Sequence, residues 1–266
     1  MKAVLALLLT AMPALAGPIT PEALPEAMQG ADVVVLGEVH DNALHHAHQA
    51  QAVAALRPRA LVFEMLTPDQ AARITPVLRA DMAALEAVLG WNASGWPDFS
   101  MYYPIFAAAP DAVVLGAALP RAEVRRAVSE GAAPVFGSEA ARYGLDQPLA
   151  PEDQAAREAL QDAAHCGKLP KTLLPGMVEA QRLRDAALAR AAVQAMEQTG
   201  GPVAVITGTG HARKDQGMPA ALALAAPDLR VLSIGQTESD PGPDAPYDLW
   251  IVTDPQPRGD PCEGIG

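Results

Sequence analysis

The chain has 266 residues, half of them hydrophobic, and a formal net charge of −12 at pH 7. This length allows one large α/β domain or two small ones, and the hydrophobic share is ample for a buried core. Because nucleic acid needs a basic protein surface, the acidic balance excludes it as an expected partner.

Residues 1–16 have the pattern of a secretory signal peptide. Lys2 gives a basic start, an apolar core follows at 3–11, and an Ala-x-Ala cleavage site ends at Ala16. We therefore expect a mature chain, 17–266, that is periplasmic or secreted. The apolar core is too short for a permanent transmembrane anchor, and no later stretch is long and apolar enough to be one.

Short apolar runs alternate with helix-like segments along the chain. Strands are predicted at 32–36, 61–64, 112–115, 203–207, 229–234 and 249–252, and helices at 42–56, 70–89 (with a start at 67–69) and 119–129. This alternation predicts an α/β fold with a central, largely parallel sheet flanked by helices. Residues 151–198 read as helical almost throughout, which indicates a helical insertion or lid subregion within a single domain spanning 17–266.

Two cysteines, Cys166 and Cys262, remain after the leader. An exported chain permits a disulfide, which would tie the C-terminal tail to the body of the protein. The alternative is one or two free thiols, since the sequence does not fix their geometry.

Aromatic side chains cluster at 90–106, although aromatic residues make up only 4% of the chain. The stretch holds Trp91, Trp96 and Tyr102. One interpretation is a satellite hydrophobic cluster beneath a long loop. The other is one wall of a pocket for a flat apolar ligand, with tyrosine hydroxyls as polar tips.

Two predicted strands end in the same Gly-x-x-His pattern. The first reads V-V-V-L-G-E-V-H and ends at His40, and the second reads V-A-V-I-T-G-T-G-H and ends at His211. Because sites in α/β sheets form outside the carboxyl ends of parallel strands, we predict that the two histidines meet in one crevice.

Two acidic residues, Glu38 and Glu64, also lie at predicted strand ends. With His40 and His211 they form a mixed nitrogen and oxygen set that suits a divalent metal such as zinc or manganese. A strand-end acid of this kind could be a metal ligand or a general base. The structural alternative for each residue is a capping or salt-bridged side chain.

Further polar residues near these strand ends have two interpretations each. His45, His46 and His48 are either an imidazole cluster near the crevice mouth or a surface run. Arg121 and Arg213 could hold a carboxylate or propionate with their planar forks, or be solvated charges. The stripe Met177, Gln181, Arg184, Asp185 and Leu188 is interpreted as helix packing with a polar edge.

Six separated segments together resemble the ChaN-like haem-binding family, which is similar to the erythromycin esterases and the Tiki and TraB metalloprotease-like proteins. The segments are V-L-G-E-V-H-D-N at 35–42, F-E-M at 63–65, W-P-D-x-x-M-Y at 96–102 with P-I-F at 104–106, H-C-G-x-L-P at 165–170, A-Q-x-x-R-D at 180–185 and I-T-G-T-G-H at 206–211. They occur in the family's order and extend over about 30–235.

The resemblance implies an α/β fold with a helical subregion and a role in haem binding and iron uptake in the bacterial envelope. Haem iron takes His or Tyr as an axial ligand, so Tyr102 is the first candidate, with His40, His211 and the helix histidines as alternatives. Arg121 or Arg213 would meet the propionates, and Trp96 belongs to the apolar slot. A haem site open on one side would favour a homodimer around paired haems.

The hydrolytic relatives imply a second function, a metal-dependent esterase or peptidase in which Glu38, His40 and His211 serve a metal-activated water. A third interpretation is an envelope protein that binds a partner and whose ancestral site is idle. The chain departs from the family in two places. Many members are lipoproteins, whereas this leader lacks a lipobox cysteine at its cleavage site, and Ala118 stands where an asparagine is expected.

Overall fold

The structure is a computed structural model that describes residues 16–260 and 262–263. The predicted signal peptide lies outside the described residues, except for Ala16, and stays a prediction.

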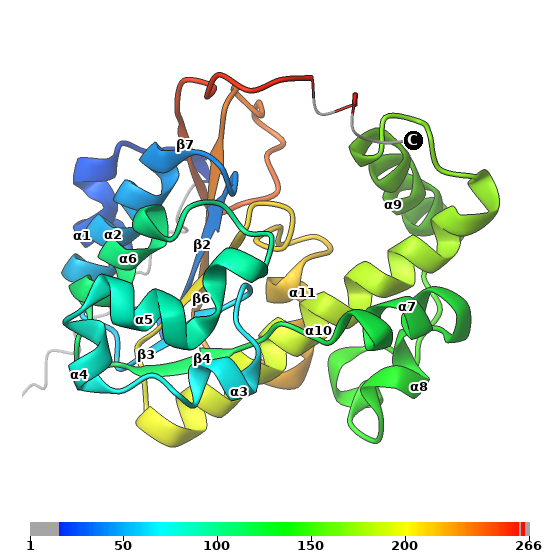
Figure 1. The fold of residues 1–266 in the computed structure, drawn as a ribbon. Helices are drawn as coiled ribbons and strands as arrows, with labels where there is room; N and C mark the ends of the chain where they lie inside the picture. The colour runs from blue at the N-terminus through cyan, green and yellow to red at the C-terminus, as the bar shows by residue number, and fades with distance from the viewer. Residues whose placement is uncertain (1–15, 261, 264–266) are drawn as a thin grey trace, which may run out of the picture.

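The described residues form one sheet of seven strands, all parallel, in the order β1-β7-β6-β2-β5-β3-β4. This architecture confirms the predicted α/β fold with its parallel sheet (Figure 1). The strands are β1 (Gly17–Pro18), β2 (Val33–Glu38), β3 (Ala60–Phe63), β4 (Val113–Gly116), β5 (Val203–Gly208), β6 (Val231–Thr237) and β7 (Leu249–Val252).

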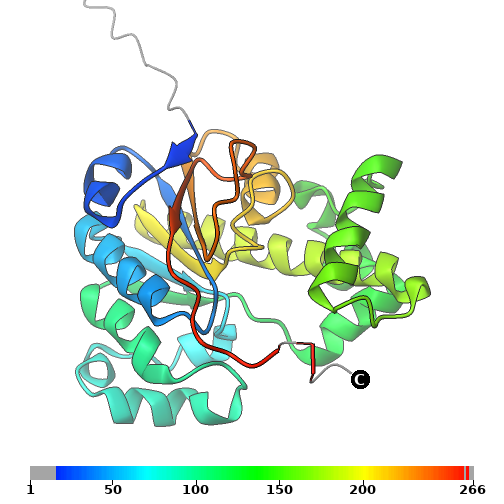
Figure 2. The same cartoon turned by 90° about the horizontal axis from the view of Figure 1, so that it is seen from above.

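Helices cover both faces of the sheet, as Figures 1 and 2 show. One face packs against α1 (Leu24–Ala27), α2 (Ala43–Leu56), α5 (Met82–Leu89) and α6 (Phe99–Ala108), with α3 (Pro68–Ala71) and α4 (Pro76–Arg79) between β3 and α5. The other packs against α7 (Arg121–Glu130), α8 (Ala132–Phe136), α10 (Leu174–Thr199) and α11 (Met218–Ala225), while α9 (Pro151–Ala164) lies against α10. Short 3-10 turns are η1 (Pro21–Ala23), η2 (Trp91–Ala93), η3 (Ala140–Tyr143) and η4 (Lys171–Leu173).

Alternate side chains of each central strand enter opposite cores. In β2, Val33 and Val35 belong to the core under α10 and α11, whereas Val34 and Leu36 belong to the core under α2 and α6. All six residues of β2 are buried. This explains the unbroken apolar run in the sequence, because a parallel strand covered by helices on both faces has no solvent side.

The predicted helix over 70–89 is wrong, because the chain forms three short helices there. Thr75 caps α4 and precedes Pro76 at its first turn, and Asp81 caps α5 by accepting a hydrogen bond from the Ala84 amide. A residue before proline is disfavoured in the helical region, so the first helix cannot run through Thr75. Each break in this segment is therefore encoded by a local capping residue.

The aromatic stretch is also more ordered than a long loop. Asp98 caps α6 by accepting a hydrogen bond from the Ser100 amide, and α6 then carries Tyr102 and Phe106 into the core. Besides α6, the structure contains β1, α8 and α11, which the sequence did not predict. The last two helices are short and rich in alanine, so they lack a strong apolar period.

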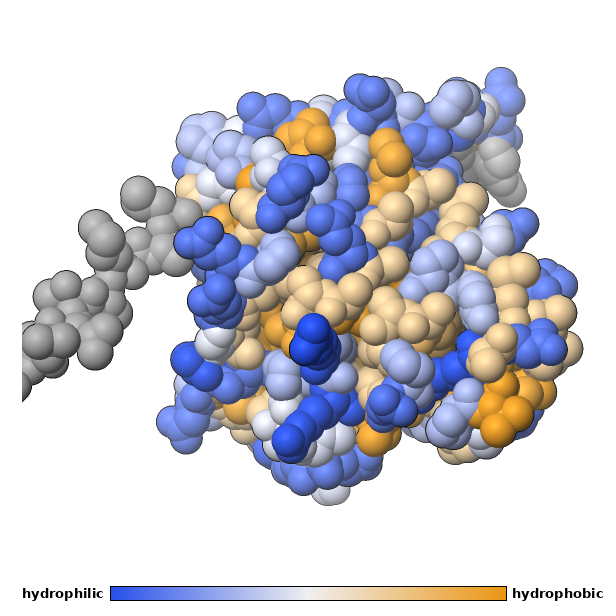
Figure 3. All heavy atoms as spheres, turned by 90° about the vertical axis from the view of Figure 1, so that its left-hand side faces the viewer, coloured by the Kyte–Doolittle hydropathy of each residue, from blue (hydrophilic) through white to orange (hydrophobic). Residues whose placement is uncertain are grey.

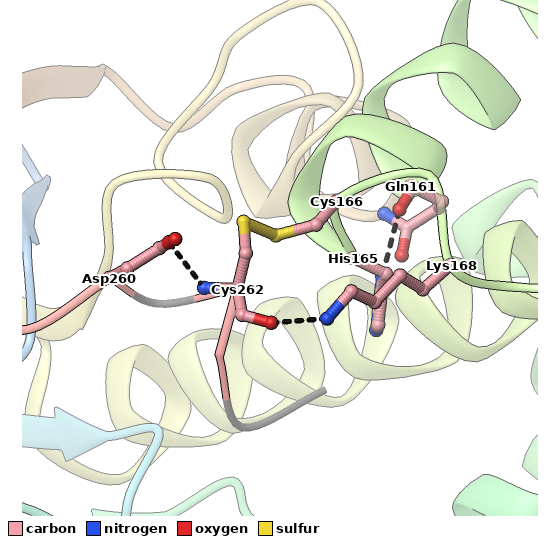
Figure 4. Close-up of a disulfide and its surroundings, with 6 residues drawn as sticks. All are labelled: Gln161, His165, Cys166, Lys168, Asp260 and Cys262. Carbon is pink, nitrogen blue, oxygen red and sulfur yellow. Dashed lines mark hydrogen bonds between the residues drawn. A yellow bond between two sulfur atoms is a disulfide. The ribbon is translucent and has the colours of Figure 1, made fainter. Parts of the chain in front are cut away.

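The C-terminal tail leaves β7 and runs toward the end of α9 (Figures 1 and 2). In the middle of this tail, the Arg258 guanidinium pairs with Asp41 and Glu238, which fixes the tail to the body of the protein. Cys262 is disulfide-bonded to Cys166, and its carbonyl accepts a hydrogen bond from a lysine next to that disulfide (Figure 4). Of the two cysteine alternatives, the structure thus shows the disulfide.

Among the described residues, no helix is both long and apolar enough to cross a membrane. Figure 3 shows the helical side that lies at the left of Figure 1, where polar side chains are interspersed among apolar ones. Such scattered apolar exposure is ordinary for a globular surface.

The crossing of α7 and α10 provides a test of the fold, because it needs a glycine. A Cβ atom at Gly176 would lie 2.2 Å from the Val128 carbonyl oxygen. We expect Gly176→Ala to lower the free energy of unfolding by about 1–3 kcal/mol, although alanine is the better helix former. Urea unfolding measures this. Gly210→Ala is the control, because a Cβ there meets nothing within 4 Å. A more stable Gly176→Ala protein would contradict the close crossing.

Candidate functional site at the carboxyl edge of the sheet

A cavity of about 1010 Å³ opens at the carboxyl ends of the central strands. Its sheet wall is formed by Glu38 at the end of β2, Glu64 directly after β3 and Gly208 at the end of β5. The facing wall comes from α7 and α10. Pockets for small molecules and cofactors span roughly 300–1,000 Å³, so this cavity is large for the class.

The two Gly-x-x-His elements lie side by side in the sheet. β2 and β5 pair in parallel, with Glu38 opposite Gly208, and His40 and His211 both line the cavity. The register follows from matching apolar runs of equal length that end at the same edge. The geometry thus joins two segments that are distant in sequence.

His40 is oriented from below by a buried carboxylate. Its Nδ1 donates a hydrogen bond to Glu38 Oε1 at 2.7 Å, which leaves Nε2 without a proton in the neutral ring. The Trp96 ring packs against the imidazole, with 4.8 Å between ring centroids. Gly208 permits this position, because a Cβ on it would lie 2.8 Å from His40 Nε2.

His211 is held between two carboxylates. Its Nδ1 donates to Asp185 Oδ1 of α10 at 2.7 Å, and its Nε2 lies 3.5 Å from Glu64 Oε1. The other oxygen of Glu64 accepts hydrogen bonds from the Thr207 hydroxyl and the Gly208 amide. Glu64 is therefore fixed between the two histidines, 4.0 Å from His40 Nε2.

The carboxylates change the ionisation of both histidines. Burial alone would lower the pKa of His211, but Glu64 and Asp185 outweigh it and raise that pKa to about 9. For His40 burial acts in the same lowering sense, and the Glu38 hydrogen bond with the Glu64 charge raises the pKa above its usual value. Burial would raise the pKa of Glu64, yet the two imidazoles lower it. At neutral pH the site therefore favours a charged His211 and an ionised Glu64.

Tyr102, the first axial candidate from the sequence, is not part of the cavity lining. The side chain is fully buried, and its hydroxyl donates to Glu38 Oε1 at 2.9 Å. Burial and the nearby Glu38 charge raise the pKa of Tyr102, so the tyrosinate that suits ferric iron is disfavoured. Tyr102 instead supports Glu38, which in turn orients His40.

Arg121 lies on the cavity wall, whereas Arg213 does not. Arg213 forms a two-point hydrogen bond with Asp215 on the surface and is absent from the cavity lining. Trp96 does line the cavity, so the pocket-wall interpretation holds for this residue. Trp91 and Tyr102 are buried in the core, so the hydrophobic-cluster interpretation holds for that part of the aromatic stretch.

The histidines of α2 are neither a surface run nor cavity ligands. His45 is fully buried and accepts from the Val39 amide, while His46 donates to the His40 carbonyl. His48 is hydrogen-bonded to the Gln236 side chain. These contacts fix the turn after β2, and burial lowers the pKa of His45 to about 4.

The proposed metal set does not have the geometry of a metal site. Within residues 16–260 and 262–263, no group of three or more His, Cys, Asp or Glu side chains is arranged to hold a metal ion. Glu38 Oε1 is occupied by hydrogen bonds from the Tyr102 hydroxyl and His40 Nδ1. The divalent-metal cofactor, and with it the hydrolase alternative on Glu38, His40, Glu64 and His211, is not supported.

The stripe on α10 combines core packing with a share of the cavity wall, because Leu188 belongs to the core under α10. Met177, Gln181, Arg184 and Leu188 line the cavity, and Asp185 bonds to His211. Spacings of three and four residues put the first four on one helical face, a signal that fits a core face and a cavity wall equally well. Arg125 of α7, also on the wall, was missed, although its i, i+4 spacing from Arg121 could have indicated it.

Comparisons with known proteins agree with this architecture. A family model described as haem-binding uptake, Tiki superfamily, ChaN matches residues 24–222. ChaN of Campylobacter jejuni, in a structure that records cofacial haem binding, matches with a TM-score of 0.66 and 20% identity over 87% of this chain and 91% of that chain. The type III effector HopBA1 matches with a TM-score of 0.51 and 15% identity over 91% of this chain and 99% of that chain. Identities this low indicate a similar fold alone. No curated protein matches by comparison of the sequences.

The charge on His211 predicts a pH-dependent stability. Its folded pKa of about 9 lies above the unfolded value of roughly 6.5, so the stabilisation is complete below about pH 6 and is lost as the pH rises through 9. The shift corresponds to about 3 kcal/mol. Urea unfolding between pH 6 and pH 9.5 should show the decline, and His211→Gln should flatten it.

His165→Gln, at the C-terminal end of α9 and outside the cavity lining, is the matched control and should keep the wild-type slope. Equal slopes in the wild type and His211→Gln would show that the two carboxylates do not stabilise the imidazolium.

Proposed function

Since the chain belongs to the ChaN haem-binding family of the Tiki superfamily, we propose that this protein binds haem in the cavity at the carboxyl edge of its sheet. The observation that carries the proposal is the pairing of one carboxylate-oriented, partly exposed imidazole, His40, with a cavity of about 1010 Å³ that has apolar and cationic surfaces. Its apolar lining includes Trp96, Leu119, Val128 and Met177.

The cavity lining offers a suitable group for each part of a haem molecule: the porphyrin plane, the propionates and the iron. The porphyrin plane needs an apolar slot, and the propionates need cations, which the facing helices supply. Bound haem would supply an iron centre that accepts a nitrogen ligand. His40 is the residue that would hold it, because the Glu38 hydrogen bond fixes the ring and raises the basicity of Nε2.

The two other candidates fit the axial position less well. His211 has a carboxylate on each side and would have to leave both to turn toward a ligand. The Tyr102 hydroxyl lies beneath Glu38 in the core. His40 is more exposed, with 32% of its side-chain surface accessible, against 12% for His211.

We extend the proposal to where the protein acts. The leader pattern and the Cys166–Cys262 disulfide favour an exported protein in an oxidising compartment. The family description as haem-binding uptake supports a role in haem or iron uptake or handling in the periplasm.

Hemin titration of the mature protein, followed by absorbance, tests haem binding. We expect a saturable Soret shift in the wild type. In His40→Ala the Soret band should move, and the Kd should rise about tenfold or more because the axial bond is lost. Tyr102→Phe should keep the wild-type spectrum, since the ring remains and the hydroxyl does not reach the cavity.

His165→Ala controls for nonspecific coordination by a histidine outside the cavity lining. No saturable shift in the wild type would reject haem binding. An unchanged spectrum in His40→Ala together with a changed one in Tyr102→Phe would reject the axial assignment.

We also propose that haem binding brings two copies together. The ChaN structure from Campylobacter jejuni records cofacial haem binding, and a cavity open on one side would leave one haem face available to a second copy. Sedimentation velocity should show the mass of a dimer with saturating hemin and a lower mass without it. A monomer with haem bound would contradict this.

A further inference from the structure

Three arginines face the cavity and have no hydrogen-bond or ion-pair partner among the described residues. They are Arg121 and Arg125 on α7 and Arg184 on α10, called here the arginine wall. In the part of the chain that the structure describes, none of the three donates a hydrogen bond or pairs with a carboxylate. By contrast, Arg126 next to them on α7 forms a two-point hydrogen bond with Glu130.

The lack of partners is notable in a chain with 31 acidic and 19 basic residues. Like charges that line one cavity repel one another, and an acidic protein has carboxylates enough to neutralise them. The wall also contains the start of α7, whose N-cap, Pro120, has no side-chain hydrogen bond to the first amides. A helix N-terminus favours negative charge, so both features attract an anion.

The opposite wall carries charges of both signs. Glu38 and Glu64 lie at the sheet edge, where they are paired with His40 and His211, and these carboxylates raise the pKa of both imidazoles. The arginines, in contrast, face the cavity without a carboxylate partner among the described residues. A ligand with carboxylates on one edge is therefore expected to enter with that edge toward the helices.

We propose that the arginine wall recognises the two carboxylates on one edge of a planar tetrapyrrole, and that these carboxylates, more than the iron, select the ligand. The inference rests on the proposed haem-binding function and deepens it. A guanidinium fork matches a carboxylate with two parallel hydrogen bonds, and three forks suffice for two carboxylates. An iron-free porphyrin dicarboxylate is accordingly a ligand of the same site.

Three probes separate the contributions of iron and carboxylate. The wild-type protein is titrated with hemin, with protoporphyrin IX and with hemin dimethyl ester, and binding is followed by absorbance and by quenching of tryptophan fluorescence. We expect protoporphyrin IX to bind within about tenfold of hemin, because it keeps both carboxylates. The dimethyl ester keeps the iron but loses both charges, and its Kd should be at least tenfold higher.

Matched variants locate the effect. Arg125→Gln and Arg184→Gln should each raise the Kd for hemin and protoporphyrin IX about tenfold and leave that of the dimethyl ester unchanged. Arg126→Gln, whose side chain is bound to Glu130, should change none of them.

The outcomes distinguish this inference from the function on which it rests. If hemin binds and its dimethyl ester binds equally well, or if the two arginine variants match Arg126→Gln, the carboxylate recognition is wrong and haem binding stands. If hemin binds and protoporphyrin IX does not, iron dominates selection and the inference also fails. If neither porphyrin binds to the wild type, the proposed function itself is rejected.

Discussion

The parallel pairing of β2 with β5 is the constraint on which the site depends. These strands are hydrogen-bonded from Val33 and Val203 up to Glu38 and Gly208, so their chain ends turn out of the sheet at the same level. His40 and His211 follow within three residues of that edge. A register slip of one residue would turn every side chain of β2 to the other face. The apolar residues on both faces therefore fix the position of the two imidazoles.

Glu64 orders the site by holding the two neighbouring histidines, His40 and His211, on either side of one carboxylate. It follows β3, the other neighbour of β5. Its Oε2 accepts hydrogen bonds from a hydroxyl and an amide of β5 and lies 4.0 Å from His40 Nε2, and its Oε1 lies 3.5 Å from His211 Nε2. A buried carboxylate without such donors would favour its neutral form. Here the donors and the imidazoles keep it ionised, and the buried charge in turn favours protonated His211. The three groups thus maintain one another's charge state.

The sequence predicts the sheet better than it predicts the site. Buried parallel strands appear as short unbroken apolar runs, so β2, β5 and β7 are readable to within two residues, and strand ends carrying Gly-x-x-His direct attention to the correct edge. Tyr102 shows the limit. A motif gives its identity, but whether its hydroxyl faces the cavity or the core depends on the packing of α6 on α2. The same holds for Asp185, because a helical period reveals a face and does not reveal what that face meets.

Helix α10 connects the sheet with the facing wall of the cavity, because it packs beneath the sheet and also contributes residues to that wall. It contains 26 residues, about 39 Å at 1.5 Å per residue, which is longer than the sheet edge alone requires. Its C-terminal half packs beneath the sheet, where Ala189, Ala192 and Val193 are buried. Its N-terminal half crosses α7 and carries Arg184 beside Asp185, so one residue binds the sheet-side histidine while its neighbour faces the cavity. Because Asp185 and Arg184 are neighbours on one helix, the position of Arg184 relative to His211 is set by α10 and not by a flexible loop.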